Sequence, residues 1–336
     1  MNNLAISLPI ISAVGSFILI FTLRLLDVFE REPIKYIFLN FVFGVIAYLI
    51  SALFVSYLFE LSGIHTSLVN LSKKTIYFSV IFSSLIMFSS QSIIGLISEN
   101  IFKKQYDTIT DYLIYFSSVG IGFSFSEVFF HNLLNKTNNE SLLAISKNLY
   151  YSSFFTGTTL PFLMAGFGAG IYLLKISKKN SSSIIFNISL LTIFFSIFIQ
   201  LLFYSMNYFI LVSIPSNHTP SDFLNLIKEL KFFANSLSEL LLVSCIGFAV
   251  LYDNYIVTNF AILVEKNLKK QFDILPFINP FSYIFSMKIK EILKVNLNYN
   301  YQDRDFQKFS NLALNNFNDK KNSSIYINEA IAIIDK

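Results

Sequence analysis

The sequence contains one cysteine, no tryptophan and few charged residues, and these shortages narrow the class of protein. The single Cys245 excludes internal disulfides and a cysteine-based metal cluster. Charged residues make up 14% of the 336 residues, whereas soluble domains have roughly 25%. The net charge of +4 is small and scattered, and no repeat, glycine-rich phosphate loop or nucleotide motif occurs. We therefore predict a membrane protein that contacts the lipid bilayer and binds no nucleic acid.

Long apolar runs dominate what is present. Hydrophobic residues make up 54% of the chain, and the mean hydropathy is +0.58. This pattern predicts an all-α, polytopic integral membrane protein with about seven transmembrane helices. The first run has no Lys or Arg before it and no small-residue cleavage site, so we expect it to be retained. The predicted spans cover about residues 4–23, 36–58, 75–97, 110–134, 151–174, 183–212 and 233–252.

The distribution of lysine and arginine predicts an orientation. These residues are more frequent in the odd-numbered connections and after residue 252 than in the even-numbered connections. We therefore expect a transmembrane domain at 1–252 with its N-terminus outside the cell membrane, and a polar, basic cytoplasmic tail at 253–336. Within the tail, FSYIFSMKIKEILKV predicts a basic amphipathic helix on the inner leaflet, and IYINEAIAIIDK predicts a short polar helix.

An ionisable pair lies in the fourth predicted span, ITDYLIYFSSVGIGFSFSEVFFHNLL. Glu127 and His131 are four residues apart, which places them on one face of a helix. A charged carboxylate inside hydrocarbon costs roughly 2.5 kcal/mol or more, so such groups normally mark a site. Gly120 and Gly122 lie about two turns away and would let a neighbouring helix come close. We expect any activity to depend on Glu127.

The connection after the first span is rich in charge. Its proline suits a helix start, because the missing N–H leaves no donor unmet. One interpretation is a stop-transfer cap that holds the first hairpin at the membrane interface. In this topology the connection lies about a full bilayer from Glu127, so a structural role is expected. The motif consists of Asp27, Glu30, Arg31, Glu32 and Pro33.

Two motifs together carry a family resemblance. The run from Asp27 to Pro33, followed by Gly-x-Gly-Phe at Gly120 leading to Glu127, resembles the PrsW family of multi-pass intramembrane proteases. The stretch Gly166 to Gly170 adds a weaker likeness, and the resemblance spans about residues 20–175. It implies an endopeptidase that acts on a transmembrane or juxtamembrane substrate, with Glu127 as the base.

The sequence departs from the family pattern at other presumed catalytic positions. Gln91 and Ser92 stand where the family has two glutamates, and Gly95 stands where it has a lysine. The asparagine expected after the later glutamate is Val128, and the histidine of the next span is absent. The resemblance therefore leaves a second interpretation, a non-catalytic relative that binds a membrane-protein client through the same cavity.

A hydrolytic site could be rebuilt from other residues. Glu127 and Glu239 are predicted at matching depth, roughly 10 Å below the outer surface, where two carboxylates would be held in different protonation states. Counting along the third span places Gln91 about 24 Å from that surface, so it would meet Glu127 only through a broken helix or shifted boundaries. The predicted catalytic groups are Glu127, His131 and Glu239, with Thr156, Thr159, Asn235 and Gln91 as supporting polar residues.

Three other roles for these residues stay open. Glu127 and His131 have an acceptable metal-ligand spacing, to which Glu239 could add a third ligand, so a divalent metal such as zinc is an alternative, and no cofactor is established. The same residues could form a structural polar cluster between helices. Glu127 and Glu239 could also relay protons in a small-solute or ion transporter.

Overall fold

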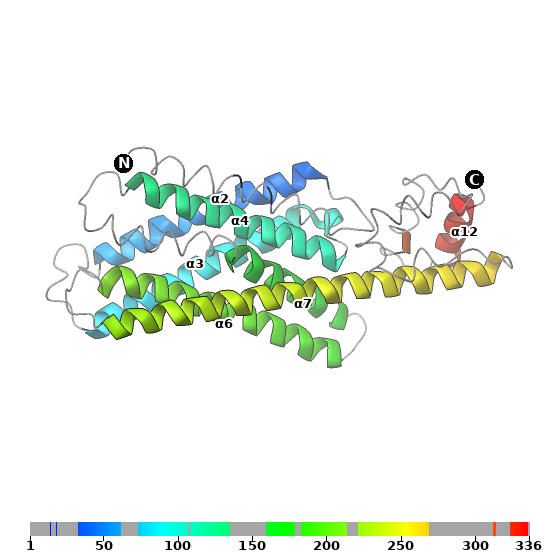
Figure 1. Cartoon of the computed structure of the whole chain (residues 1–336). Helices are drawn as coiled ribbons and strands as arrows, with labels where there is room; N and C mark the ends of the chain where they lie inside the picture. The colour runs from blue at the N-terminus through cyan, green and yellow to red at the C-terminus, as the bar shows by residue number, and fades with distance from the viewer. Residues whose placement is uncertain are drawn as a thin grey trace.

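The computed structural model of this chain describes residues 14, 18, 33–61, 73–106, 108–134, 159–178, 183–213, 221–268, 312–313 and 323–334. This part of the chain is helical and contains no β-strand (Figure 1), which confirms the all-α prediction. The helices are α2 (Ile34–Leu61), α3 (Lys73–Ile101), the 3-10 helix η1 (Lys103–Gln105), α4 (Ile109–Leu134), a helix at Thr159–Lys178, α6 (Ser183–Ser213), α7 (Ser221–Leu268) and α12 (Ser323–Ile334).

Five helical segments are long and apolar enough to cross a membrane, so a multi-pass membrane protein is supported by length and composition. The predicted first span, residues 4–23, lies almost entirely outside the described residues. The 26-residue α4 would extend about 39 Å but is not one of the five. The five segments are Ile34–Leu58, Ile81–Ile101, Thr159–Lys178, Ser183–Ser205 and Phe232–Ala249.

Helix α4 forms the centre of the bundle. Every side chain from Thr108 to Ser124 is buried. The start of the helix is fixed by a reciprocal cap, in which the Thr108 backbone N–H donates to Asp111 Oδ2 at 2.6 Å and the Asp111 backbone N–H donates to Thr108 Oγ1 at 3.2 Å. A helix that is capped at its start and buried from Thr108 to Ser124 is a rigid support for any group that it carries.

Glycines let two helices approach α4 to backbone contact. A Cβ on Gly122 would overlap the carbonyl oxygen of Phe41 in α2, and a Cβ on Gly120 would lie 2.8 Å from Pro161 Cα in the Thr159–Lys178 helix. From α2, a Cβ on Gly44 would overlap the carbonyl oxygen of Val119. These contacts confirm the predicted role of Gly120 and Gly122 in close helix packing.

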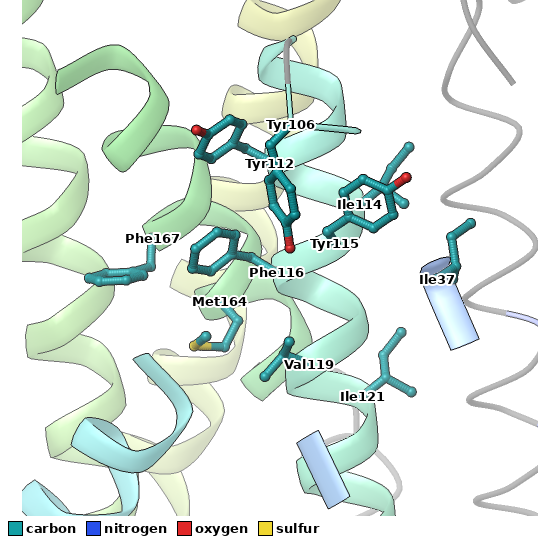
Figure 2. Close-up of a cluster of buried hydrophobic side chains, with 10 residues drawn as sticks. All are labelled: Ile37, Tyr106, Tyr112, Ile114, Tyr115, Phe116, Val119, Ile121, Met164 and Phe167. Carbon is teal, nitrogen blue, oxygen red and sulfur yellow. The ribbon is translucent and has the colours of Figure 1, made fainter. Parts of the chain in front are cut away.

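Aromatic side chains fill the bundle around the first half of α4. Figure 2 shows Tyr106, Tyr112 and Phe116 grouped together, with Phe167 and Met164 of the Thr159–Lys178 helix beside them. Tyr106 and Tyr112 meet edge to face with ring centroids 5.1 Å apart, a favourable aromatic geometry. This cluster lies at the level of the N-terminal half of α4, and a second buried cluster surrounds Phe123 further along the helix.

Helix α7 is longer than the sequence pattern predicts. Its 48 residues extend about 72 Å and continue through residue 252, the predicted end of the transmembrane domain. Figure 1 shows its second half running past the bundle to α12. There α12 packs on α7, and Phe260, Val264 and Ala330 are buried. The predicted C-terminal helix is confirmed by α12, while the predicted basic helix at 281–295 lies outside the described residues.

Candidate functional site

Glu127 lies on α4 just beyond the fully buried stretch. Its side chain is half-buried and interacts electrostatically with Tyr48 of α2. The Tyr48 ring meets Phe123 edge to face, with centroids 5.3 Å apart. Phe123, which contacts the Tyr48 ring, and Glu127 are four residues apart and so lie on the same face of α4. His131 belongs to the same helix, but its side chain is outside the described residues.

A second polar group links α3 to α6. Gln91 Nε2 donates to the Tyr204 hydroxyl at 2.5 Å, and Gln200 Nε2 donates to Gln91 Oε1 at 2.9 Å. Gln91 and Gln200 are both fully buried. The two bonds satisfy both polar atoms of the Gln91 amide, whereas Gln200 Oε1 has no hydrogen-bond partner among the described residues. In an apolar interior, bonds of this kind hold the two helices in one register.

One aromatic cluster separates the two polar groups. Phe123 contacts Tyr48 on one side and Tyr204 on the other, with the Tyr204 centroid 6.3 Å away. A Cβ on Gly95 would lie 2.6 Å from the Phe116 ring, so these two residues are at about the same level. Since α3 and α4 are antiparallel, Gln91, four residues before Gly95, is at about the level of Gly120, four residues after Phe116. Gln91 is therefore about 10 Å along the axis from Glu127. The two residues flank a common packed cluster rather than facing each other.

The positions that match the family's two glutamates and lysine are tightly packed here. Gln91 is fully buried, Ser92 is 6% exposed, and neither carries a charge. The space next to Gly95 is filled by the Phe116 ring, so a long side chain at position 95 would displace that ring. Glycine at position 95 therefore lets the Phe116 ring of α4 pack against α3.

Glu239 is placed differently from the sequence prediction. Its side chain is exposed on α7. A Cβ on Gly166 would lie 2.7 Å from Leu241, and a Cβ on Gly168 would lie 2.8 Å from Phe116. These contacts put Glu239 near the middle of α4, about 15 Å along the axis from Glu127. The predicted depth of Glu239 was counted from residue 233, the start of the seventh predicted span. Helix α7 begins twelve residues earlier, at Ser221, so residue 233 does not mark the end of the helix.

The other predicted site residues are only partly described. Thr159 is fully buried at the start of its helix. Thr156 and the motif from Asp27 to Glu32 lie outside the described residues, as does the side chain of Asn235. Pro33 directly precedes α2, where its carbonyl accepts a hydrogen bond from the Tyr36 backbone N–H at 3.0 Å. The predicted helix start at Pro33 agrees with this position.

A buried ion pair at the other end of the bundle was not predicted. Lys175 of the Thr159–Lys178 helix pairs with Glu99 of α3, which is 5% exposed. The Tyr112 hydroxyl donates to Glu99 Oε1 at 2.7 Å, and Lys175 Nζ donates to that hydroxyl oxygen at 3.0 Å. The only sequence signal was one acid and one base at span ends on the same side of the membrane.

A neutral network adjoins this ion pair. Ser98 donates to Asn40 Oδ1, and the Tyr106 hydroxyl donates to the same oxygen at 3.1 Å. The Asn40 amide donates in turn to the Tyr36 carbonyl at 2.9 Å. Since Ser98 precedes Glu99 in the chain, the last turn of α3 is bonded to α2, α4 and the Thr159–Lys178 helix.

In the part of the chain that the structure describes, no three His, Cys, Asp or Glu side chains come together as a metal site. A scan against protein-family models, a search of curated proteins and a search of solved structures each give no match to this chain.

Proposed function

We propose that this chain is a multi-pass, PrsW-like membrane protein that binds transmembrane segments of other membrane proteins without cleaving them. The observation that carries the proposal is the bonding of Gln91. Both polar atoms of its amide are engaged with Gln200 and Tyr204 at the position where the resembling proteases have a glutamate.

Peptide hydrolysis needs a group that accepts a proton from water and a position for that water. An amide does not act as a base at neutral pH, and the neighbouring Ser92 is buried and uncharged. The Phe116 ring occupies the space that a lysine at position 95 would need. At these three positions the chain thus presents a hydrogen-bonded amide, a buried hydroxyl and a glycine covered by an aromatic ring, and none of these is a base.

Glu127 keeps a role in binding under this proposal. Its half-buried carboxylate lies at the edge of the packed core, where Tyr48 is its described electrostatic neighbour. A hydrogen bond to a carboxylate contributes more in hydrocarbon than in water, because competing water is absent. Glu127 would therefore recognise polar or backbone groups of a partner helix at this depth.

A second candidate function is an active endopeptidase with Glu127 as the base. It is favoured by the contact of Tyr48 with Phe123, one turn of α4 from Glu127, because a phenol on that face can donate a hydrogen bond to a developing oxyanion. The transporter alternative receives less support, because Glu239 lies on an exposed face and about 15 Å along the axis from Glu127.

The proposed orientation has the N-terminus outside and the C-terminus in the cytoplasm of the cell membrane. It is supported by the excess of Lys and Arg in the odd-numbered connections and the tail. This orientation is tested with single cysteines placed at Ser67 or Ser323 in a Cys245→Ala background. Intact cells that express these variants are treated with a thiol reagent that does not cross the membrane. Labelling at 323 from outside would contradict this orientation.

Binding can be measured with the full chain in proteoliposomes. Fluorescent transmembrane peptides that carry a polar residue at different depths would be titrated, and energy transfer to a label on the protein would report association. Glu127→Leu should weaken the binding of the best peptide about tenfold, by removing a charge-assisted hydrogen bond. Glu239→Leu removes an exposed carboxylate and serves as the matched control. Equal binding by the wild type and Glu127→Leu would refute the binding role of Glu127.

A further inference from the structure

Four exposed lysines gather where the last turn of α3 meets the start of α2 and the end of the Thr159–Lys178 helix. The rings of Tyr36 and Phe102, with centroids 5.2 Å apart, bring their chain neighbours Lys35 and Lys103 together. Lys175 pairs with Glu99 in the last turn of α3, four residues before Lys103, which begins η1. We name this set the lysine rim, and it consists of Lys35, Lys103, Lys175 and Lys178.

The described acids at this end leave the rim positively charged. Glu99 is buried and paired with Lys175, and Asp111 is buried in the cap of α4. Lys175 and Lys178 are three residues apart, so they lie on the same side of their helix. In the described part of this surface, the lysine ammonium groups are therefore exposed, whereas the carboxylates of Glu99 and Asp111 are buried.

Lys175 connects the surface to the core. Its ammonium has three N–H donors, and two are directed to Glu99 and the Tyr112 hydroxyl. Half of the side chain is exposed, at 50% of its surface. The ammonium thus has donor capacity for an acceptor that approaches from the membrane surface, and the buried pair fixes its position.

Tyrosines mark the depth of this end in a bilayer. Tyr36 and Tyr172 are half-buried there, and Tyr172 packs against Tyr252 of α7 with centroids 6.5 Å apart. Tyrosines concentrate at the membrane–water interface, and lysines extend from there to the headgroups. The lysine rim is therefore at headgroup level, where phosphate is the abundant anion.

We propose that the lysine rim binds the phosphate group of an anionic lipid. The phosphate accepts from Lys103, Lys178 and the exposed side of Lys175, while Glu99 and Tyr112 hold Lys175 in place from below. Each lysine near a charged membrane surface contributes enough attraction to change lipid retention about fivefold. The inference is independent of whether Glu127 takes part in chemistry.

The experiment uses the full chain in nanodiscs made of phosphatidylcholine with a minor fraction of phosphatidylglycerol. Lipids that remain bound after mild detergent extraction are quantified by mass spectrometry. The double variant Lys103→Gln/Lys178→Gln leaves the Glu99–Lys175 pair intact. It should reduce the enrichment of phosphatidylglycerol about tenfold or more relative to the wild type. The matched control is Lys73→Gln/Lys74→Gln at the opposite end of α3, which should stay within about twofold of the wild type.

Further arms keep the test decisive. Lys103→Arg/Lys178→Arg should retain the enrichment, and the unfolding midpoint in pure phosphatidylcholine shows whether each variant folds. Rising salt should lower the enrichment by the wild type, because exposed charges are screened, and this arm needs no variant. Wild-type enrichment in the Gln double variant, an equal loss in the control, or insensitivity to salt would each overturn the proposal. The unfolding midpoint of the wild type is also measured with phosphatidylglycerol and, separately, with inorganic phosphate in lipid-free detergent. If inorganic phosphate raises the midpoint as much as phosphatidylglycerol does, the site binds a free anion, and the proposal of a lipid ligand is overturned.

Discussion

Replacing Gly122 with alanine should destabilise the bundle, although alanine is the better helix former. The new Cβ would overlap the carbonyl oxygen of Phe41, which is backbone and cannot rotate away. Helices α2 and α4 would have to separate, and overpacking of this kind costs about 1–3 kcal/mol. The gain in helix propensity recovers at most about 1 kcal/mol. Because the overlap is with backbone, the upper part of this range applies, about 2–3 kcal/mol, and subtracting the propensity gain of about 1 kcal/mol leaves an expected net loss in the free energy of unfolding of about 1–2 kcal/mol.

Gly247 of α7 offers a matched control in another long apolar helix. A Cβ on Gly247 would have no described atom within 4 Å. Gly247→Ala should therefore be neutral or stabilise by up to about 1 kcal/mol. The assay is reversible unfolding of the reconstituted protein in mixed micelles with increasing denaturing detergent. Shifts of the same sign and size for both variants would refute the reasoning that close helix contact, rather than propensity, selects glycine at position 122.

Three further changes test the polar and terminal contacts. Lys175→Met removes one partner of the buried Glu99 carboxylate, while the Tyr112 hydrogen bond remains, and should destabilise by about 1–3 kcal/mol in the same unfolding assay. Adding Glu99→Gln should restore part of the loss. Gln200→Leu removes one hydrogen bond of Gln91 and should cost about 1–3 kcal/mol, whereas the double change to leucine should cost less than the sum of the single changes. Ala330→Glu places a charge at the buried contact of α12 with α7 and should speed proteolysis of the C-terminal region while the bundle resists. Unchanged proteolysis would contradict that contact.

Much of the fold could be predicted because it follows from local properties of the chain. The apolar runs predicted at 36–58 and 183–212 correspond to Ile34–Leu61 and Ser183–Ser213. The role of Gly120 and Gly122 was also predictable, since a pair of small residues in an apolar helix indicates close packing. Length, hydropathy and glycine spacing are all readable without knowledge of the partner helix.

The polar networks could not be predicted, because they depend on the rotation and register of helices far apart in the sequence. Gln91 and Gln200 are separated by 109 residues, and nothing in either span indicates the other. The extension of α7 was missed for a related reason. Polar residues after 252 ended the predicted span, yet the helix continues, and its buried Phe260 and Val264 lie in the half that packs with α12.

The candidate site contains one residue that the sequence pattern identified, Glu127, and one whose depth it could not predict, Glu239. The sequence pattern directed attention to Glu127, and the structure places this residue at the edge of the core beside Tyr48. The catalytic role of Glu127, and those of His131 and Glu239, stay predictions. The depth of Glu239 could not be counted from the sequence, because the count assumed that the helix and the membrane span end together.

The central claim, binding without cleavage, is tested most directly by mass spectrometry of a bound transmembrane peptide. Wild-type proteoliposomes would be incubated with the best-binding peptide in heavy-oxygen water, which labels the new carboxyl terminus of any hydrolysed peptide. The account predicts that the peptide is recovered bound, intact and unlabelled. Labelled fragments that form with the wild type and disappear with Glu127→Gln would contradict it and establish Glu127 as the base of an active intramembrane protease.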